Sequence, residues 1–243
     1  MIHDTSLDQL VDRVCRHWEA RRRAEAARKE QAEHPVHAFT IAVAREAGIL
    51  GTSVAREVGR RLDWQVYDHE LLERIATEMG LRTNLLESVD EKRESWLRES
   101  AEAFMDLPSV SENAYVQHLI GTVLALGAHG ECVIVGRGAA QVLPPDTTLR
   151  VRLVAPLKDR IEALARQRGL SRQQAACDVE HIDRDRVDFV QNHFLKDPAD
   201  PRNYDLLLNT SRFSIGECAE LIIEALHRLQ ARALHAGRVL SSP

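Results

Sequence analysis

Aromatic residues are scarce in this chain of 243 residues, because Phe, Trp and Tyr together make up only 5% of it. A protein that stacks single-stranded bases on a row of rings needs more of them. The chain also lacks an excess of basic residues, since 32 Lys and Arg stand against 37 Asp and Glu, a formal net charge of −5. Both absences argue against a nucleic-acid polymer as the partner.

Cysteine is scarcer still, and no C-x-x-C pair is present. The four cysteines lie far apart, at Cys15, Cys132, Cys177 and Cys218. This spacing is typical of isolated thiols in a reducing compartment rather than of a disulfide frame or a zinc site. No apolar run approaches the roughly 20 residues that cross a membrane, and the acidic N-terminus lacks the apolar region of a signal peptide. We therefore expect a cytoplasmic protein with no membrane partner.

A complete phosphate-binding loop is also absent. An apolar run at 36–43 leads into a bend that contains Gly48 and Gly51, and an amphipathic helix is expected from Ser53 to Leu62. The consensus G-x-x-x-x-G-K-[ST] is not met, because the glycines are too close together and no lysine follows them. The order of strand, glycine bend and helix still predicts backbone N–H groups that face a phosphate at a helix N-terminus.

The composition, 44% hydrophobic and 28% charged, fits a globular protein with a sizeable core. Residues 1–34 form a block of their own, with apolar residues at helical spacing: Leu7, Leu10, Val11, Val14 and Trp18. They predict an N-terminal amphipathic helical extension. It is either a surface helix with a charged outer face, or a helix that binds a partner or a second copy of the chain. We expect a main domain at 35–235 and a C-terminal tail at 236–243.

Strand-like and helix-like segments alternate through the main domain. Further strands are expected at 65–67, 132–135, 149–154 and 205–208, and further helices at 70–79, 157–168 and 215–233. Residues 81–128 hold no strand-like run and predict a helical insertion. Ser171 predicts the start of a long polar helix that reaches Phe194, within a lid region at 171–203. The alternation predicts an α/β fold, a doubly wound parallel sheet covered on both faces.

Ligands of such sheets bind beyond the carboxyl ends of the strands. The first bend offers Gly48, Gly51 and the hydroxyls of Thr52 and Ser53 there. A hydroxyl such as that of Ser53 either ligates the Mg²⁺ of a bound nucleotide or simply caps the helix. Arg45, just before the bend, either binds a phosphate or pairs with a nearby acid.

A second bend, Gly136-Arg137-Gly138, directly follows a buried strand. Glycine lets the backbone turn sharply or approach a ligand, and arginine presents a planar fork to a phosphate or a carboxylate. The alternative is a tight turn with Arg137 in a structural ion pair. On the long polar helix, Asp183 and Arg186 share one face, either toward a ligand or as an exposed pair.

A turn after the second strand holds Asp68 and His69. They are either an acid–base couple or a turn aspartate beside a solvent-exposed histidine.

Six segments, taken in order, resemble the cytidylate kinase-like family, a branch of the P-loop nucleoside monophosphate kinases. They are residues 40–51, 67–72, 133–139, 151–156 with Arg160, 183–186 and 204–211. The resemblance covers roughly residues 36–229. It implies a P-loop kinase-like sheet with a mobile helical lobe for the monophosphate and a lid. It also implies transfer of the γ-phosphoryl of ATP, bound with Mg²⁺, to CMP or a related monophosphate.

The resemblance also implies roles for single residues. Residues 48–53 would hold the donor phosphates, and Arg137 and Asp68 would line the acceptor site. Arg184 and Arg186 would close from the lid onto the transferring group. Asp183 would orient Arg186 or bind the acceptor sugar.

Two departures from the family weaken the expected catalysis. Gly51 stands where authentic cytidylate kinases carry the loop lysine, and Gly138 stands where they carry an acid. Ile49 and Leu50 add bulk to the bend. A well-placed transition-state cation is worth on the order of 10³ to 10⁵ in rate, so turnover is expected to be very slow unless Arg45 or a lid arginine substitutes for the lysine.

Three hypotheses therefore remain open. The first is an ATP-dependent nucleoside monophosphate kinase, with CMP the leading acceptor. The second is a catalytically silent nucleotide-binding regulatory protein that retains the kinase fold. The third is an interaction protein whose functional part is the N-terminal helix.

Overall fold

The computed structural model describes residues 38–72 and 114–240, with side chains to residue 235. The N-terminal extension, most of the helix expected at 70–79 and the first part of the expected insertion lie outside these residues. Within them, five parallel strands form one sheet in the order β2-β3-β1-β4-β5. The strands are β1 Thr40–Arg45, β2 Gln65–Tyr67, β3 Cys132–Val135, β4 Thr148–Val154 and β5 Leu206–Asn209.

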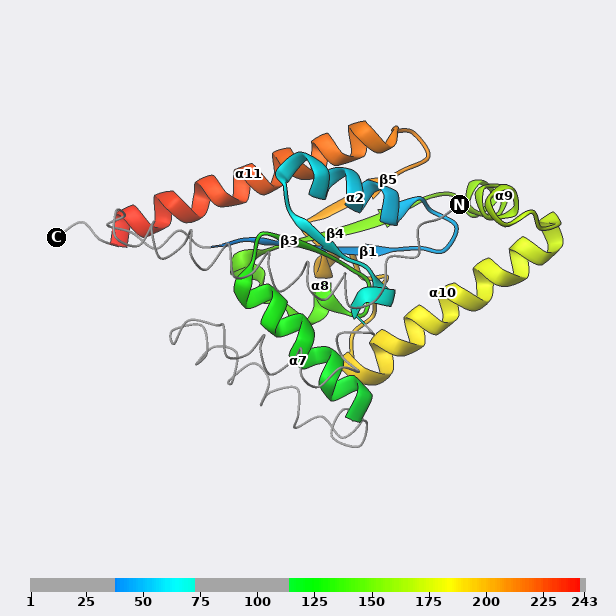
Figure 1. The fold of residues 1–243 in the computed structure, drawn as a ribbon, viewed down its shortest axis with the longest axis horizontal. Coiled ribbons are helices and arrows are strands. Elements are labelled where there is room, and N and C mark those ends of the chain that lie inside the picture. Colours follow the sequence, from blue (N-terminus) through cyan, green and yellow to red (C-terminus); the bar gives the residue numbers. More distant parts are fainter. Residues whose placement is uncertain (1–37, 73–113, 241–243) are drawn as a thin grey trace.

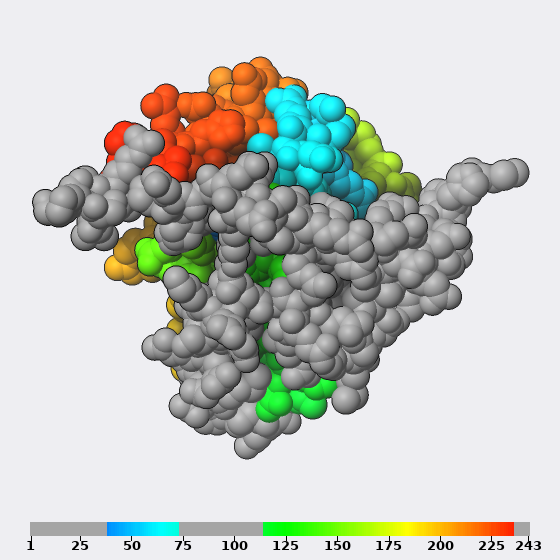
Figure 2. All heavy atoms as spheres, turned by 60° about the vertical axis from the view of Figure 1, so that its left-hand side comes forward, coloured from blue at the N-terminus to red at the C-terminus, as the bar shows by residue number. Residues whose placement is uncertain are grey.

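Helices cover both faces of this sheet (Figure 1). The longer described helices are α2 Gly51–Leu62, α7 Ala114–His129, α9 Leu157–Arg168, α10 Arg172–Phe194 and α11 Ile215–Leu240; α8 is the single turn Ala139–Val142. Helices α2 and α11 pack together on one face, as both views of the molecule show (Figures 1 and 2). Helices α7 and α8 lie on the other face. The predicted doubly wound parallel sheet is therefore confirmed.

Two separate apolar clusters result from this arrangement. On the face of α2 and α11, the side chains of Ile41, Val43 and Val58 are buried with residues of both helices. On the other face, Ala42 and Ile134 are buried against α7. Adjacent strand residues point to opposite faces, which explains why both faces of β1 carry apolar side chains.

Helix α7 forms the last part of the expected helical insertion. It is a core helix, since residues along its length, from Val116 to Ala128, are buried in the apolar cluster on this face of the sheet. Because it connects β2 to the neighbouring parallel strand β3, it is the crossover helix that a parallel pair requires.

The ends of three helices refine the sequence-based picture. Helix α2 begins at Gly51, two residues before the predicted start. The predicted cap of α10 is confirmed, because the hydroxyl of Ser171 accepts from the amide of Gln174 while the Gln174 side chain accepts from the amide of Ser171. Helix α11 continues to Leu240, so most of the expected C-terminal tail extends this helix. In the described ranges, no helix combines the length and apolarity that crossing a bilayer demands.

Candidate active site

A pocket of about 820 Å³ lies beyond the carboxyl ends of β1 and β3, between the two glycine bends and α10. Seven of the eleven predicted site residues line it: Arg45, Gly48, Thr52, Gly136, Arg137, Asp183 and Arg186. The other four are not among its lining residues: Gly51, Ser53, Asp68 and Arg184. The pocket is therefore located where the sequence predicted it, with a smaller set of side chains around it.

The first bend keeps the pocket open. Gly48 adopts a left-handed conformation (φ 77°), and a Cβ atom there would lie 2.4 Å from the carbonyl oxygen of Arg160. Leu50 is 50% exposed and does not line the pocket. Ile49 lines the pocket and also packs against the cluster under α2. The bulk of these two side chains therefore does not fill the space above the bend.

Helix α2 presents an uncapped N-terminus to this space. Its N-cap residue, Leu50, makes no side-chain hydrogen bond, and its first turn holds no acidic residue. The free N–H groups of such a turn, together with the helix dipole, favour an anion. Ser53 is the third residue of the helix rather than its cap, and Thr52 is the hydroxyl residue that lines the pocket.

A resident metal site is not built into the described residues. They contain no group of three or more His, Cys, Asp or Glu side chains that could hold a metal ion.

Arg45 crosses from the first bend to the second. A Cβ atom at position 51 would lie 2.7 Å from Cδ of Arg45, and one at position 136 would lie 3.0 Å from its Nη1. The aliphatic part of Arg45 thus lies over Gly51 and its guanidinium lies beside Gly136. The absence of side chains at these two glycines makes room for an arginine.

Three arginines gather at this point: Arg45, Arg137 and Arg186. Burial, followed by the positive charge of Arg186, lowers the pKa of Arg45 to about 10. Burial also lowers the pKa of Arg186; the negative charge of Asp183 opposes this shift, and the positive charge of Arg137 adds to it. Among the described residues, no carboxylate lies within ion-pair distance of Arg45 or Arg186. Cations held together in this way leave a strong local attraction for an anion.

The three arginines are held by different elements. Arg186, on α10, donates from Nη1 to the carbonyl oxygen of Arg45 at 3.0 Å. Arg137, at the second bend, has a positive φ of 50° and lies 5.7 Å from the centroid of the Phe189 ring on α10. This distance is within the range of a cation–π contact. The end of β1, the bend after β3 and α10 thus meet at one place.

Asp68 and Arg184 lie in other contacts. A carboxylate oxygen of Asp68 accepts from the amide of Leu71 at 3.2 Å, and the other pairs with Arg56 at 3.2 Å. Asp68 therefore caps the helix that begins after β2. Arg184 is 63% exposed and pairs with Glu180, one turn earlier on α10. Neither contact places the side chain on the pocket.

Sequence reasoning gave no role to four residues that surround the bend. They are Glu46, Arg152, Arg160 and Phe189. Glu46 pairs with Arg160 at 3.3 Å and with Arg152 at 3.7 Å. A signal was present for Arg152, because Arg150 and Arg152 alternate with apolar residues in β4 and so point to one face of the sheet.

Comparison with known proteins gives the family of this chain and some of its relatives. The sequence pattern of the cytidylate kinase-like family matches residues 40–212, more than half of the chain. The chain is 33% identical over 110 residues to a uronate isomerase from Corynebacterium glutamicum, a segment covering 44% of this chain and 21% of that protein. It is 30% identical over 112 residues to a cytidylate kinase from Methanopyrus kandleri, covering 42% of this chain and 58% of the kinase. The chain thus spans less than two thirds of each relative.

Among solved structures, an uncharacterized protein from Eubacterium ventriosum superposes with a TM-score of 0.63 at 18% identity. The superposition covers 78% of this chain and 98% of that protein, so the two share a fold. With the parallel sheet, the uncapped helix beneath the first bend and the family pattern in agreement, the chain belongs to the cytidylate kinase-like family.

Proposed function

We propose that this protein transfers the γ-phosphoryl group of MgATP to a nucleoside monophosphate, with CMP the leading acceptor. The observation that carries the proposal is the gathering of Arg45, Arg137 and Arg186 above the uncapped N-terminus of α2, in a pocket of about 820 Å³. A triphosphate bound by the bend and a monophosphate bound opposite would bring their anionic groups together at these arginines.

The chemistry needs little more from the protein. Phosphoryl transfer proceeds by in-line displacement, and charge spreads over the equatorial oxygens of the moving group. Amides of residues 48–53 would bind the donor phosphates. Arg45 and Arg186 would neutralise the charge on the transferring group, and Arg137 would orient the acceptor phosphate. Arg45 would then supply the cation that the loop lysine supplies in authentic cytidylate kinases. Its guanidinium would reach the pocket from the end of β1, whereas the lysine would come from the start of α2.

CMP as the acceptor depends on the family and on the name of the Methanopyrus kandleri relative. The pocket walls toward β4 are polar, with Arg152, Gln141 and Tyr204 among the lining residues. These residues are compatible with a nucleotide and do not by themselves select a base.

A catalytically silent nucleotide-binding protein is the second candidate, and one observation favours it. The amide of Ala47, within the first bend, is already hydrogen-bonded to Asp183 at 2.7 Å, so this donor is unavailable to a phosphate. With no lysine in the bend either, the donor site has fewer ligands than a complete phosphate loop.

A coupled assay of ADP release, run with CMP, dCMP, UMP, AMP and GMP in turn, separates the candidates. The kinase proposal expects at least one acceptor to raise ADP release above the rate with MgATP alone. If none does, and calorimetry still detects MgATP, the silent binder is the better description. If MgATP does not bind at all, both nucleotide-based proposals fail.

A further inference from the structure

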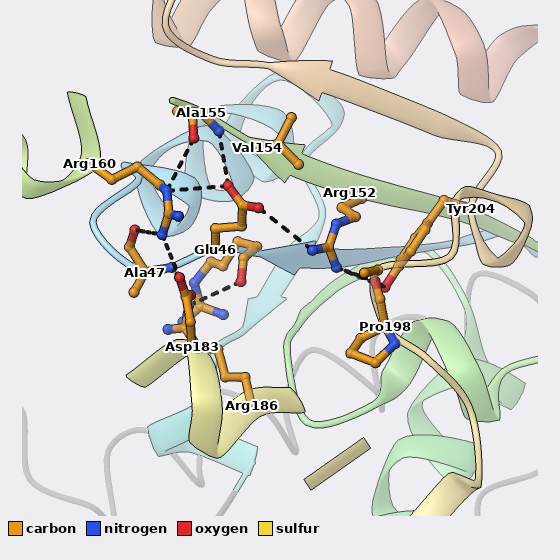
Figure 3. Close-up of polar contacts among 12 residues, drawn as sticks. Glu46, Ala47, Arg152, Val154, Ala155, Arg160, Asp183, Arg186, Pro198 and Tyr204 are labelled. Carbon is orange, nitrogen blue, oxygen red and sulfur yellow. Dashed lines mark hydrogen bonds and ion pairs between the residues drawn. The ribbon is translucent and has the colours of Figure 1, made fainter. Parts of the chain in front are cut away.

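Asp183 makes contacts that differ from a role in binding the acceptor. Its Oδ1 accepts from the amide of Ala47 at 2.7 Å, and its Oδ2 pairs with Nη1 of Arg160 at 2.5 Å. Both carboxylate oxygens are therefore directed at the first bend and at α9, as the close-up shows (Figure 3). From α10, this residue holds the backbone of the donor loop.

Arg160 completes the connection from α9. It is only 8% exposed, and within the described residues it is the only charged residue classed as buried. Its guanidinium donates to the carbonyl oxygens of Ala47 and Ala155, and it pairs with Asp183 and Glu46 (Figure 3). Arg160 therefore fixes the carbonyl of the same loop residue whose amide Asp183 fixes. The peptide groups on both sides of Ala47 are thus oriented by one side chain of α9 and one of α10.

Apolar packing joins the same parts. Ala47 is buried in a small cluster with Leu164 of α9 and with Ala175 and Val179 of α10. Ala47 is the only fully buried member of this cluster that does not belong to α9 or α10. The first bend is thus attached to α9 and α10 by the side chain of Ala47 as well as by its backbone.

We propose that Asp183 is a positioning residue that shapes the first bend, the candidate donor loop, so that the order of this loop depends on its contacts with α10. The inference rests on the proposed function, because a loop shaped in this way matters only if it binds phosphates. With Ala47 held toward Asp183, the amides that follow it, from Gly48 to the first turn of α2, are left to face the pocket. Losing Asp183 would loosen these donors although the side chain touches neither nucleotide.

Asp183→Asn is the informative substitution. The amide can still accept from Ala47, but its NH₂ group would face the guanidinium of Arg160, and the ion pair is lost. Glu180→Gln is the matched control, because it removes one carboxylate from an exposed site on the same helix. Asp183→Glu tests whether the charge alone suffices, since it keeps the carboxylate but lengthens the side chain by one methylene group.

Three measurements test the effect of each substitution: MgATP affinity by calorimetry, amide hydrogen exchange of residues 45–53, and the KM for the acceptor. For Asp183→Asn we expect MgATP affinity to fall about tenfold, exchange of the loop to accelerate, and the acceptor KM to change less than threefold. Glu180→Gln should match the wild type, and Arg160→Met should reproduce Asp183→Asn without adding to it in the double variant.

The opposite pattern overturns the proposal. A raised acceptor KM, with loop exchange and MgATP affinity unchanged, would mean that Asp183 contacts the acceptor directly. Absence of turnover with every acceptor in the wild type would instead reject the proposed reaction. Loop exchange in Asp183→Asn, compared with Glu180→Gln, still decides the positioning role in that case, since it requires no nucleotide and no turnover.

Discussion

The ring of Phe194 occupies the space in which a Cβ atom of residue 138 would lie. An ideal Cβ at Gly138 would stand 2.1 Å from Cε2 of Phe194, and Gly138 has a left-handed φ of 73°. The last residue of α10 is therefore packed directly onto the bend that carries Arg137. This contact gives a physical reason for glycine where authentic cytidylate kinases carry an acid.

Gly138→Ala is expected to destabilise the protein by about 2–5 kcal/mol. A left-handed conformation costs a residue with a side chain about 1–2 kcal/mol, and overpacking adds about 1–3 kcal/mol. The free energy of unfolding in urea measures the loss.

The partner variant tests the mechanism of that loss. Phe194→Ala alone leaves a cavity, and the two changes together should cost about 1–3 kcal/mol less than the sum of the single changes. Strict additivity would show that the backbone conformation of Gly138, and not the contact with Phe194, sets the requirement for glycine.

Gly51→Ala should lower the activity of the protein with little effect on its stability. Gly51 lies at the start of α2, where alanine has the higher helix propensity by about 1 kcal/mol. The new methyl group would stand 2.7 Å from Cδ of Arg45 and displace that flexible side chain. We expect an almost unchanged melting temperature and a kcat/KM at least about tenfold lower. A variant as active as the wild type would mean that the position of Arg45 over Gly51 is not needed.

Much of the fold could be predicted from the sequence because its signals are local. The apolar run of β3, the alternation in β4 and the serine cap of α10 each depend on neighbouring residues. The helix starting at Gly51 was placed two residues late, because a hydroxyl residue such as Ser53 is also a good cap. Helix α7 lies in the segment predicted to be a helical insertion because that segment holds no strand-like run. The weak periodicity of this largely apolar helix does not show from the sequence which of its faces packs on the sheet.

The candidate site was predictable only in part, since its geometry depends on contacts between distant segments. The sequence singled out Arg45, Arg137 and Arg186, each as either a ligand-binding residue or a member of a structural pair, and only the resemblance to the family implied a phosphate role for them. It could not show that Asp183 reaches Ala47, 136 residues away, or which of Arg184 and Arg186 faces the pocket. On a helix, two residues of separation place side chains on different faces.

The buried positive charge of Arg45 should lower the free energy of unfolding of the protein. Its folded-state pKa of about 10 is below its value in the unfolded chain. Below pH 10 both states are protonated, so the cost of the buried cation is fully present at neutral pH and is relieved only as the pH rises through 10. We therefore expect Arg45→Met to be as stable as the wild type or about 1 kcal/mol more stable after lost contacts are deducted, roughly 2–4 °C in melting temperature.

Deprotonation of Arg45 should weaken anion binding, although it relieves the cost that the buried charge imposes on stability. A bound polyphosphate stabilises the protonated guanidinium, so affinity for inorganic tripolyphosphate should be constant up to about pH 9 and weaken above the Arg45 pKa of about 10. Calorimetry at several pH values measures this. Arg45→Met should bind more weakly throughout and show a flatter profile, and an identical decline in both proteins would assign the titration to another group.

Arg186→Ala and Arg184→Ala form a matched pair on α10. Arg186 reaches the carbonyl oxygen of Arg45 and lines the pocket, whereas Arg184 is exposed and pairs with Glu180. If Arg186 neutralises the transferring phosphoryl, its loss should lower kcat by about 10²-fold or more. The melting temperature should change little, because a lost hydrogen bond worth about 1 kcal/mol is offset by relief from the charges of Arg45 and Arg137.

Arg184→Ala should cost only the roughly 0.3–0.5 kcal/mol of an exposed ion pair and leave kcat unchanged. Equal losses of kcat in both variants would show that Arg184 also reaches the substrate, which would require α10 to rotate or shift when nucleotides bind.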